Sequence, residues 1–222
     1  MNESLIVADV LWHGDEIFEI QFERNGITFM PGDCLALFAE DGRESRPYSM
    51  ASGCDESIVR FVIRRMNDGV VTPHLATRTP GDYVKCSPPF GWFKPGQCDG
   101  APFVFIATGT GISPFLSYLR TYLDRPPVEC LYGVRVLKDT VDIHWLKQQC
   151  HVKLCVSRET STEYFQGRVT DLLEDMPLSK DHHYYLCGLD TMIDETTKWL
   201  EKSGVNISNI HRECFFNESY SA

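Results

Sequence analysis

Short segments of alternating hydrophobic and polar residues make up the first part of the chain. Such alternation is typical of antiparallel strands that bury one face. Turn sequences, Pro31-Gly32-Asp33 and Thr79-Pro80-Gly81-Asp82, precede two of the segments. The spacing predicts a small closed barrel or a sandwich. We expect strands over Ser4–Val10, Ile17–Glu23, Cys34–Phe38, Ile58–Arg64 and Tyr83–Cys86, and one short helix over Thr72–Thr77.

Beyond about residue 97 the pattern changes to hydrophobic strands that alternate with longer helical segments. This alternation predicts a parallel sheet with helices on both faces, and ligands bind beyond the carboxyl ends of such strands. The polar, turn-rich passage from Lys94 to Pro102 marks the boundary, so we expect two domains, residues 1–97 and 98–222. Expected strands are Phe103–Ala107, Val128–Tyr132, Val152–Ser157, Tyr184–Cys187 and Ile207–Arg212; expected helices are Ile112–Leu123, Val141–Cys150, Val169–Met176 and Thr191–Lys202.

Composition and charge narrow the class of protein. The 222 residues are 43% hydrophobic and 23% charged, which is ordinary globular usage. A net charge of −10 argues against a nucleic-acid binder and against an anionic membrane surface. Nine cysteines without a CxxC pair favour neither a disulfide scaffold nor a metal site. Without a basic leader or a long apolar run, the sequence predicts a soluble, cytoplasmic protein, and nothing in it requires more than a monomer.

The first candidate motif is Arg46-Pro47-Tyr48-Ser49, with a guanidinium, an aromatic ring and a hydroxyl within four residues. In an extended strand Arg46 and Tyr48 share one face and Ser49 lies on the other. Together they suit a planar ligand that bears a phosphate. A half-exposed strand with incidental polar residues fits the same pattern.

The second motif, Gly69–Leu75, predicts the start of a helix, because Thr72 is a good N-cap and Pro73 suits the first helical position. The N–H groups there and the Thr72 hydroxyl would bind a pyrophosphate. Most helix N-termini bind only water, so this motif also has a purely structural interpretation.

The third motif, Gly109-Thr110-Gly111-Ile112-Ser113-Pro114, is a glycine-rich turn from a strand into a helix. Turns of this kind hold dinucleotides at a helix N-terminus. The motif departs from GxGxxG, so a different dinucleotide fold is indicated.

The fourth motif comprises three arginines and a serine. Arg135 follows the second predicted strand of this half, Ser157-Arg158 follows the third, and Arg168 lies just before the next predicted helix. Converging guanidiniums and a hydroxyl suit the 2′-phosphate that distinguishes NADP from NAD. Unrelated surface arginines would give the same spacing.

The last two motifs, Cys187-Gly188 and Glu213-Cys214-Phe215-Phe216, fall at the same predicted sheet edge. A buried cysteine and a terminal aromatic pair are ordinary core residues, so only their shared position favours function.

In this order and spacing, the six motifs resemble the ferredoxin–NADP reductase superfamily, which includes the flavin reductases and cytochrome b5 reductases. The resemblance covers nearly the whole chain. It implies an α+β two-domain protein, in which an antiparallel six-stranded FAD-binding β-barrel is followed by an α/β parallel-sheet NADP-binding domain.

Carried over by motif, Arg46 would contact the FAD pyrophosphate, Tyr48 would pack against the flavin, and Ser49 would hydrogen-bond near flavin N5 as a catalytic candidate. Plant-type members end at a tyrosine that covers the flavin, and Phe215, Phe216 and Tyr220 are the candidates here. The resemblance also assigns FAD binding to Pro47, Val62, Ile63, Arg64, Gly69, Val70, Val71 and Thr72, with the pyrophosphate at the last three.

In the second domain, the resemblance places Thr110 and Gly111 under the nicotinamide dinucleotide. Cys187, Gly188 and Glu213 would lie beside the nicotinamide, with Cys187 and Glu213 as catalytic candidates. Ser157-Arg158-Glu159 is similar to the NADP-selective branches, with Arg135 and Arg168 in support, so NADPH is favoured over NADH.

The implied activity is hydride transfer between NADPH and bound FAD, with electrons passed to or from ferredoxin, flavodoxin, another small redox protein or an oxygenase component. An NAD(P)H–flavin reductase with free flavin as substrate, or a non-catalytic flavin-binding module, are the alternatives. Because ferredoxins and flavodoxins are acidic, docking to a chain of charge −10 requires a local basic patch. Candidates for that patch are Arg60, Arg64, Arg65 and Lys85.

Overall fold

The computed structural model describes residues 3–160 and 163–216, except for the side chains of residues 3, 215 and 216. Its contacts divide the chain into two compact units. One unit comprises residues 1–94 with 113–122, and the other comprises residues 95–112 with 123–222. The boundary expected after residue 97 stays a prediction.

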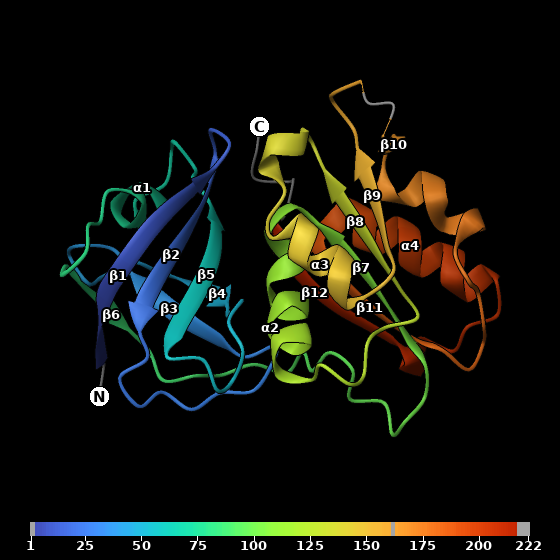
Figure 1. Ribbon diagram of the computed structural model, residues 1–222, viewed down its shortest axis with the longest axis horizontal. Coiled ribbons are helices and arrows are strands. Elements are labelled where there is room, and N and C mark those ends of the chain that lie inside the picture. Colours follow the sequence, from blue (N-terminus) through green and yellow to red (C-terminus); the bar gives the residue numbers. More distant parts are fainter. Residues whose placement is uncertain (1–2, 161–162, 217–222) are drawn as a thin grey trace. The chain divides into compact units, whose positions relative to one another are not determined.

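The described residues of the first unit form six strands, paired antiparallel in the order β4-β3-β6-β1-β2-β5 (Figure 1). An isolated bridge between Met50, just after β4, and Phe61 of β5 joins the two ends of this order, so the sheet closes into a barrel. The elements are β1 (Glu3–His13), β2 (Ile17–Glu23), β3 (Cys34–Phe38), β4 (Ser45–Ser49), β5 (Ile58–Arg64), α1 (Val71–Ala76) and β6 (Tyr83–Cys86).

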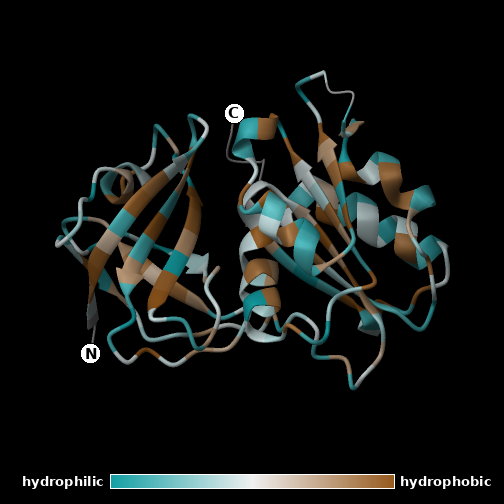
Figure 2. Cartoon of the chain, viewed as in Figure 1, coloured by the Kyte–Doolittle hydropathy of each residue, from teal (hydrophilic) through white to brown (hydrophobic). Residues whose placement is uncertain are grey.

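Alternation along the strands fills this barrel. Phe18, Ile20 and Phe22 of β2 are fully buried and pack with Phe61 in one hydrophobic cluster. Figure 2 shows hydrophobic residues along the strands of both sheets. The bounds of β2, β3, β5 and β6 match the predicted ones, while β1 runs three residues further than expected, to His13.

The helix α2 (Ser113–Thr121) groups by contacts with the first unit, although it follows the first strand of the second sheet in the chain. The Cys54 backbone N–H donates to Thr121 Oγ1 over 3.1 Å, and Arg120 pairs with Glu56 at 3.3 Å. The predicted helix over residues 112–123 is therefore one 3₁₀ turn, η1 (Gly109–Ile112), followed by α2.

In the described part of the second unit, six strands pair in parallel in the order β10-β9-β8-β7-β11-β12. The burial of both faces explains why β7, β8 and β11 read as continuous hydrophobic runs. The elements are β7 (Phe103–Thr108), β8 (Glu129–Val134), η2 (Leu137–Asp139), α3 (Ile143–Gln149), β9 (Val152–Val156), β10 (Phe165–Gln166), η3 (Val169–Asp175), β11 (His183–Leu189), α4 (Asp190–Lys202), η4 (Ile207–Asn209) and β12 (Ile210–Phe216).

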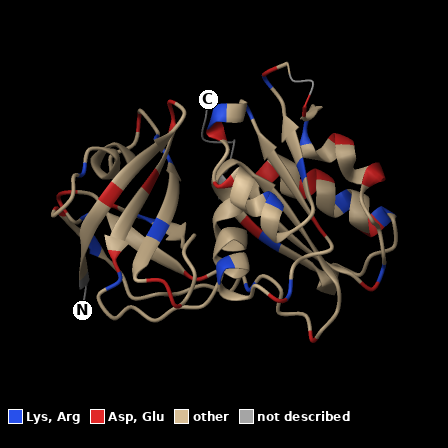
Figure 3. Cartoon of the chain, in the orientation of Figure 1, with Lys and Arg blue, Asp and Glu red and all other residues tan. Residues whose placement is uncertain are grey.

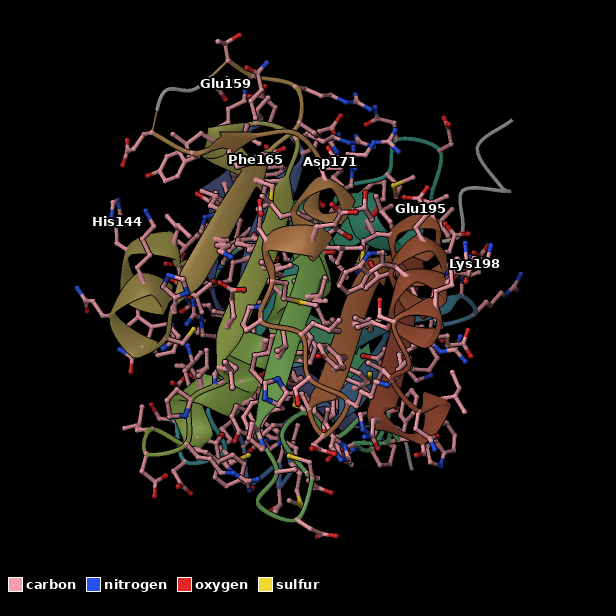
Figure 4. The ribbon with its side chains drawn as sticks, turned by 90° about the vertical axis from the view of Figure 1, so that its right-hand side faces the viewer. His144, Glu159, Phe165, Asp171, Glu195 and Lys198 are labelled. Atoms are coloured by element: carbon pink, nitrogen blue, oxygen red, sulfur yellow. The ribbon has the colours of Figure 1, made fainter. Side chains whose placement is uncertain are left out.

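Helices cover both faces of this sheet, as the sequence predicts. Residues of η3 and α4 pack with the strands in one buried cluster that includes Leu173, Ile193 and Leu186. Figure 4 shows α3, which carries His144, on the opposite side of the sheet from α4, which carries Glu195 and Lys198. The segment expected as an α-helix over residues 169–176 is the 3₁₀ helix η3, and the first three residues of the strand expected over 207–212 form η4.

Candidate cofactor sites

Strand β4 carries the Arg46–Ser49 motif at one end of the strand order in the first unit. Ser49 is 2% exposed, and its Oγ lies 3.2 Å from Cys34 Sγ on β3. Arg46 has the opposite environment: its side chain is 61% exposed, and its guanidinium donates to the Ser45 carbonyl and lies 3.7 Å from Glu44. The strand thus presents one fixed hydroxyl and one guanidinium that is accessible to solvent.

Tyr48 lies between these two residues and packs against the barrel core. Burial raises the pKa of the Tyr48 phenol well above its usual range, although the nearby Arg46 charge opposes the effect. Its hydroxyl is buried and has no hydrogen-bond partner within residues 3–160 and 163–216. A buried phenol without a partner is uncommon, and it marks a place where a polar ligand atom would be stabilised.

The predicted FAD-lining strand is β5, where neighbouring side chains face opposite ways. Ile63 is 1% exposed and belongs to the barrel core, so only its backbone is available to a ligand. Val62 is on the other face, directly opposite Glu19 of β2, and is 3% exposed. Arg64, at the end of the strand, pairs with Glu16.

The start of α1 differs from the sequence-based prediction. The helix begins at Val71 with Val70 at the N-cap, so Thr72 is its second residue and Pro73 its third. The Thr72 hydroxyl accepts the Met66 N–H over 2.8 Å, which closes the loop containing Gly69 rather than capping the helix. Among the described residues, no side chain caps this end of α1. The N-cap assignment to Thr72 was therefore wrong by two residues, because the loop takes its hydroxyl.

Two glycines bring the dinucleotide turn against β11 in the second unit. A Cβ on Gly111 would lie 2.3 Å from the Cys187 carbonyl oxygen, and one on Gly188, at φ +139°, would lie 2.1 Å from Thr108 Oγ1. The same Thr108 hydroxyl accepts the Leu189 N–H over 2.9 Å. The turn and the end of β11 thus meet backbone to backbone, which only glycine permits at these positions.

Cys187 and Glu213 are brought together by strand register. They are direct partners in the parallel pairing of β11 with β12, and Cys187 also pairs with Ala107 of β7. The buried Cys187 thiol lies 4.0 Å from Glu213 Oε2, and Thr110 is 3% exposed. The sequence placed these residues at one sheet edge, and the structure places them there. The side chains of Phe215 and Phe216, and all of Tyr220, lie outside the described residues.

The predicted phosphate-binding residues lie in loops that follow three neighbouring strands. Arg135 follows β8, Ser157 and Arg158 follow β9, and Arg168 lies two residues beyond β10. The Arg158 N–H donates to the Arg135 carbonyl over 2.8 Å, so the first two loops are joined by their backbones. Arg158, Arg168 and Ser157 are exposed, and Arg135 is half-buried.

Two carboxylates bind backbone groups in or next to the loops that carry these arginines. Glu159 Oε2 accepts the Leu137 N–H over 2.8 Å, and Asp171 Oδ2 accepts the Arg168 N–H over 2.8 Å. Figure 4 shows Glu159, Phe165 and Asp171 toward one end of the sheet. Because both carboxylates already bind backbone groups, they fix the loops around the arginines.

Among the candidates for a basic patch, Arg60, Arg64, Arg65 and Lys85, the first two form ion pairs. Arg60 is held by Glu19 and is only 13% exposed, while Lys85 Nζ lies 5.1 Å from the centre of the Phe38 ring. Figure 3 shows Lys and Arg interspersed with Asp and Glu along both units. Local ion pairing thus removes Arg60 from the group of candidates.

Sequence reasoning missed Cys34 and Glu19, which contact the candidate FAD-binding strands. Cys34 reads as an ordinary strand cysteine, and Glu19 as a solvent-facing position of an alternating strand. The weak signal for Glu19 was an acidic residue on one predicted strand and a basic residue, Arg60, on another.

None of the described helices is long and apolar enough to span a membrane. Within residues 3–160 and 163–216, no group of three or more His, Cys, Asp and Glu residues is placed to hold a metal ion.

Comparisons with known proteins agree with this division of the chain. The model of the oxidoreductase FAD-binding domain matches residues 6–94, and that of the oxidoreductase NAD-binding domain matches residues 105–198. A ferredoxin–NADP reductase of Neisseria gonorrhoeae, solved with bound FAD and NADP, has the same fold, with a TM-score of 0.84 at 19% identity over 97% of this chain and 99% of that one.

Curated relatives include electron-transfer proteins of two lengths. The toluate 1,2-dioxygenase electron transfer component of Pseudomonas putida is 26% identical over 86% of this chain, which spans only 60% of that protein. The ferredoxin–NADP reductase of Pseudomonas aeruginosa is 30% identical over 91% of this chain and 90% of that protein. With that identity along nearly the full length of both proteins, the chain belongs to the ferredoxin–NADP reductase family of FAD- and NAD-binding oxidoreductases.

Proposed function

We propose that this protein is an FAD-dependent NAD(P)H oxidoreductase that takes hydride from NADPH and passes electrons to a small redox protein or an oxygenase component. The observation that carries the proposal is the presence of two complementary sites in two units. One unit holds the Arg46–Ser49 motif, and the other holds the glycine turn beside Cys187 and Glu213.

The residues of the first unit fit FAD. The buried Tyr48 hydroxyl lacks a partner among the described residues, Ser49 offers a fixed hydroxyl, and the accessible Arg46 guanidinium suits a pyrophosphate. The free start of α1 adds the backbone N–H groups of Val71 and Thr72. When bound, FAD supplies the hydride-accepting centre and the capacity to release electrons singly or in pairs.

The protein's own residues orient and polarise the reactants in this proposal. With FAD bound, Ser49 would donate a hydrogen bond to flavin N5, and Tyr48 would hold the ring by packing. Thr110 and Gly111 would support the nicotinamide dinucleotide. Cys187, held near Glu213, would restrict the position of the nicotinamide and exclude water from it.

NADPH preference rests on the arginine cluster. Arg135 and Arg158 come from backbone-linked loops, Ser157 precedes Arg158 on the same loop, and Arg168 lies beyond the neighbouring strand β10. A 2′-phosphate would pair with these guanidiniums, whereas a 2′-hydroxyl gains much less from them.

The acceptor is proposed by class only. Several relatives are electron-transfer components of oxygenase systems, and others are ferredoxin or flavodoxin reductases. A ferredoxin, a flavodoxin or an oxygenase component therefore fits the proposal, with the reductase acting as a cytoplasmic monomer.

An anaerobic visible spectrum tests the proposal. We expect purified protein to show bound flavin, and NADPH to bleach it faster than NADH. A protein that purifies colourless but reduces added flavin would support the free-flavin reductase instead. Bound flavin that neither nucleotide bleaches would support a non-catalytic module.

A further inference from the structure

The Ser49 hydroxyl contacts a thiol, that of Cys34, to which the proposed function assigns no role. Cys34 on β3 lies directly opposite Ser49 on β4, and its Sγ is 3.2 Å from Ser49 Oγ. Cys34 is 6% exposed and Ser49 2%, so the contact is shielded from water. Because either atom can be the donor, the pair forms a hydrogen bond in two orientations.

Backbone hydrogen bonds to the Phe90 segment also fix the position of Cys34. The Cys34 N–H donates to the Phe90 carbonyl over 2.6 Å, and the Cys34 carbonyl accepts the Phe90 N–H over 3.0 Å. The adjoining residue, Asp33, accepts the Met50 N–H over 3.1 Å. Cys34 is therefore held between β4 and the Phe90 segment, and its side chain has little freedom to leave Ser49.

The Ser49 hydroxyl and the Cys34 thiol can each donate or accept a hydrogen bond. A hydroxyl has a single proton, so when Ser49 donates that proton to an outside acceptor, its oxygen is left to accept a hydrogen bond. A thiol S–H can supply that bond. When an outside N–H instead donates to Ser49, the hydroxyl proton turns toward Cys34 Sγ, which accepts it. A hydrocarbon side chain at position 34 would satisfy neither orientation.

We propose that Cys34 is a positioning residue for Ser49: its thiol holds the hydroxyl and lets it alternate between donating to N5 of oxidised flavin and accepting from N5–H of reduced flavin. The inference rests on the proposed function. No proton is transferred between the two side chains, because only the orientation of each O–H and S–H bond changes.

The first test needs no flavin. The infrared S–H stretching band of Cys34 is identified as the band that Cys34→Ser removes from the spectrum of the apoprotein, which has nine cysteines. We expect Ser49→Ala to shift this band, because the thiol loses its oxygen partner. Ser45→Ala, on the same strand, is the matched control and should leave the band in place. An unmoved band in Ser49→Ala overturns the contact and with it the inference.

The second test measures flavin reduction and potential in the holoprotein. Cys34→Ala should slow single-turnover reduction by NADPH about three- to tenfold, the effect of one neutral hydrogen bond, and should change the midpoint potential of bound FAD. Cys34→Ser keeps a donor and an acceptor and should restore both values to near wild type. Cys86→Ala removes another buried thiol of the barrel and serves as the control for packing.

A double-mutant cycle separates positioning from packing. If Cys34 acts through Ser49, Cys34→Ala should have no further effect on rate or potential in a Ser49→Ala background. Equal slowing in both backgrounds overturns the inference, because the effect of the Cys34 thiol would then come from packing in the barrel and not from its contact with Ser49. A protein that binds no flavin but retains the infrared shift overturns the proposed function while leaving the Cys34–Ser49 contact standing.

Discussion

Glu19 and Arg60 form a buried ion pair on the face of β2 and β5 that includes Val62. Arg60 Nε and Nη2 lie 2.9 Å and 2.5 Å from the two Glu19 carboxylate oxygens, and Glu19 is 1% exposed. Burial raises the pKa of Glu19, but interactions with His13, Arg60 and Gln21 outweigh it and lower the pKa from 4.5 to about 2. The Glu19→Gln substitution tests this balance.

The magnitude follows from that pKa. A fall from 4.5 to about 2 corresponds to about 3 kcal/mol of stability at neutral pH, at ~1.4 kcal/mol per pH unit. Removing one member of a buried ion pair costs about 3–5 kcal/mol, which agrees. Since the folded-state pKa is lowered, the stabilisation is present above the unfolded pKa and is lost as the pH falls from 4.5 toward 2.

Urea unfolding of wild type and Glu19→Gln, near pH 7 and again near pH 3, measures the free energy of unfolding that the pair contributes and how that contribution changes with pH. We expect the variant to lose about 3 kcal/mol near pH 7 and distinctly less near pH 3. Glu16→Gln is the control, because it removes a carboxylate whose side chain is 56% exposed. Glu16 lies in the turn just before β2 and pairs with Arg64 at the end of β5, and its loss should cost under about 1 kcal/mol. A loss from Glu19→Gln as small as the control, or one that does not change with pH, would refute this reasoning.

Three further predictions concern the second unit. Arg158→Ala should raise the KM for NADPH about tenfold or more and leave that for NADH nearly unchanged, and equal changes in steady-state kinetics would contradict the 2′-phosphate role. Gly188→Ala should destabilise the protein by about 2–4 kcal/mol in urea unfolding, because its Cβ would meet Thr108 Oγ1 at 2.1 Å; unchanged stability would show that the turn can move away. Burial and the neighbouring His183 lower the pKa of His211, so stability should fall as the pH drops below about 6.5, and His211→Gln should reduce that slope in unfolding titrations at several pH values.

The sequence predicted the strands better than the helix ends, and the reason is physical. Alternation with a period of two is decided by which residues can be buried, so β2, β3, β5 and β6 have the expected bounds. A helix end depends on what each polar side chain binds, and Thr72 binds the Met66 N–H in the preceding loop. The strand β10 has only two residues and carries no periodic signal.

The candidate sites likewise contain residues that the sequence could place and contacts that it could not. Cys187, Glu213 and the arginine loops could be placed at one sheet edge because parallel strands end there together. The partner of Ser49 could not be predicted, because strand order alone does not give the register that sets Cys34 opposite it. The Glu19–Arg60 pair likewise depends on how β2 aligns with β5.

Both units position a candidate catalytic side chain by the same device. Ser49 faces Cys34, and Cys187 faces Glu213, in each case as direct partners on neighbouring strands. Strand register is fixed by burial of the sheet faces, so these pairs cannot shift without exposing core residues. The arginines that would select the nucleotide lie instead on exposed loops, where substitutions leave the register unchanged. It follows that changes at Arg158 should alter nucleotide choice without altering flavin reduction at saturating nucleotide, whereas changes at Cys34 should do the reverse.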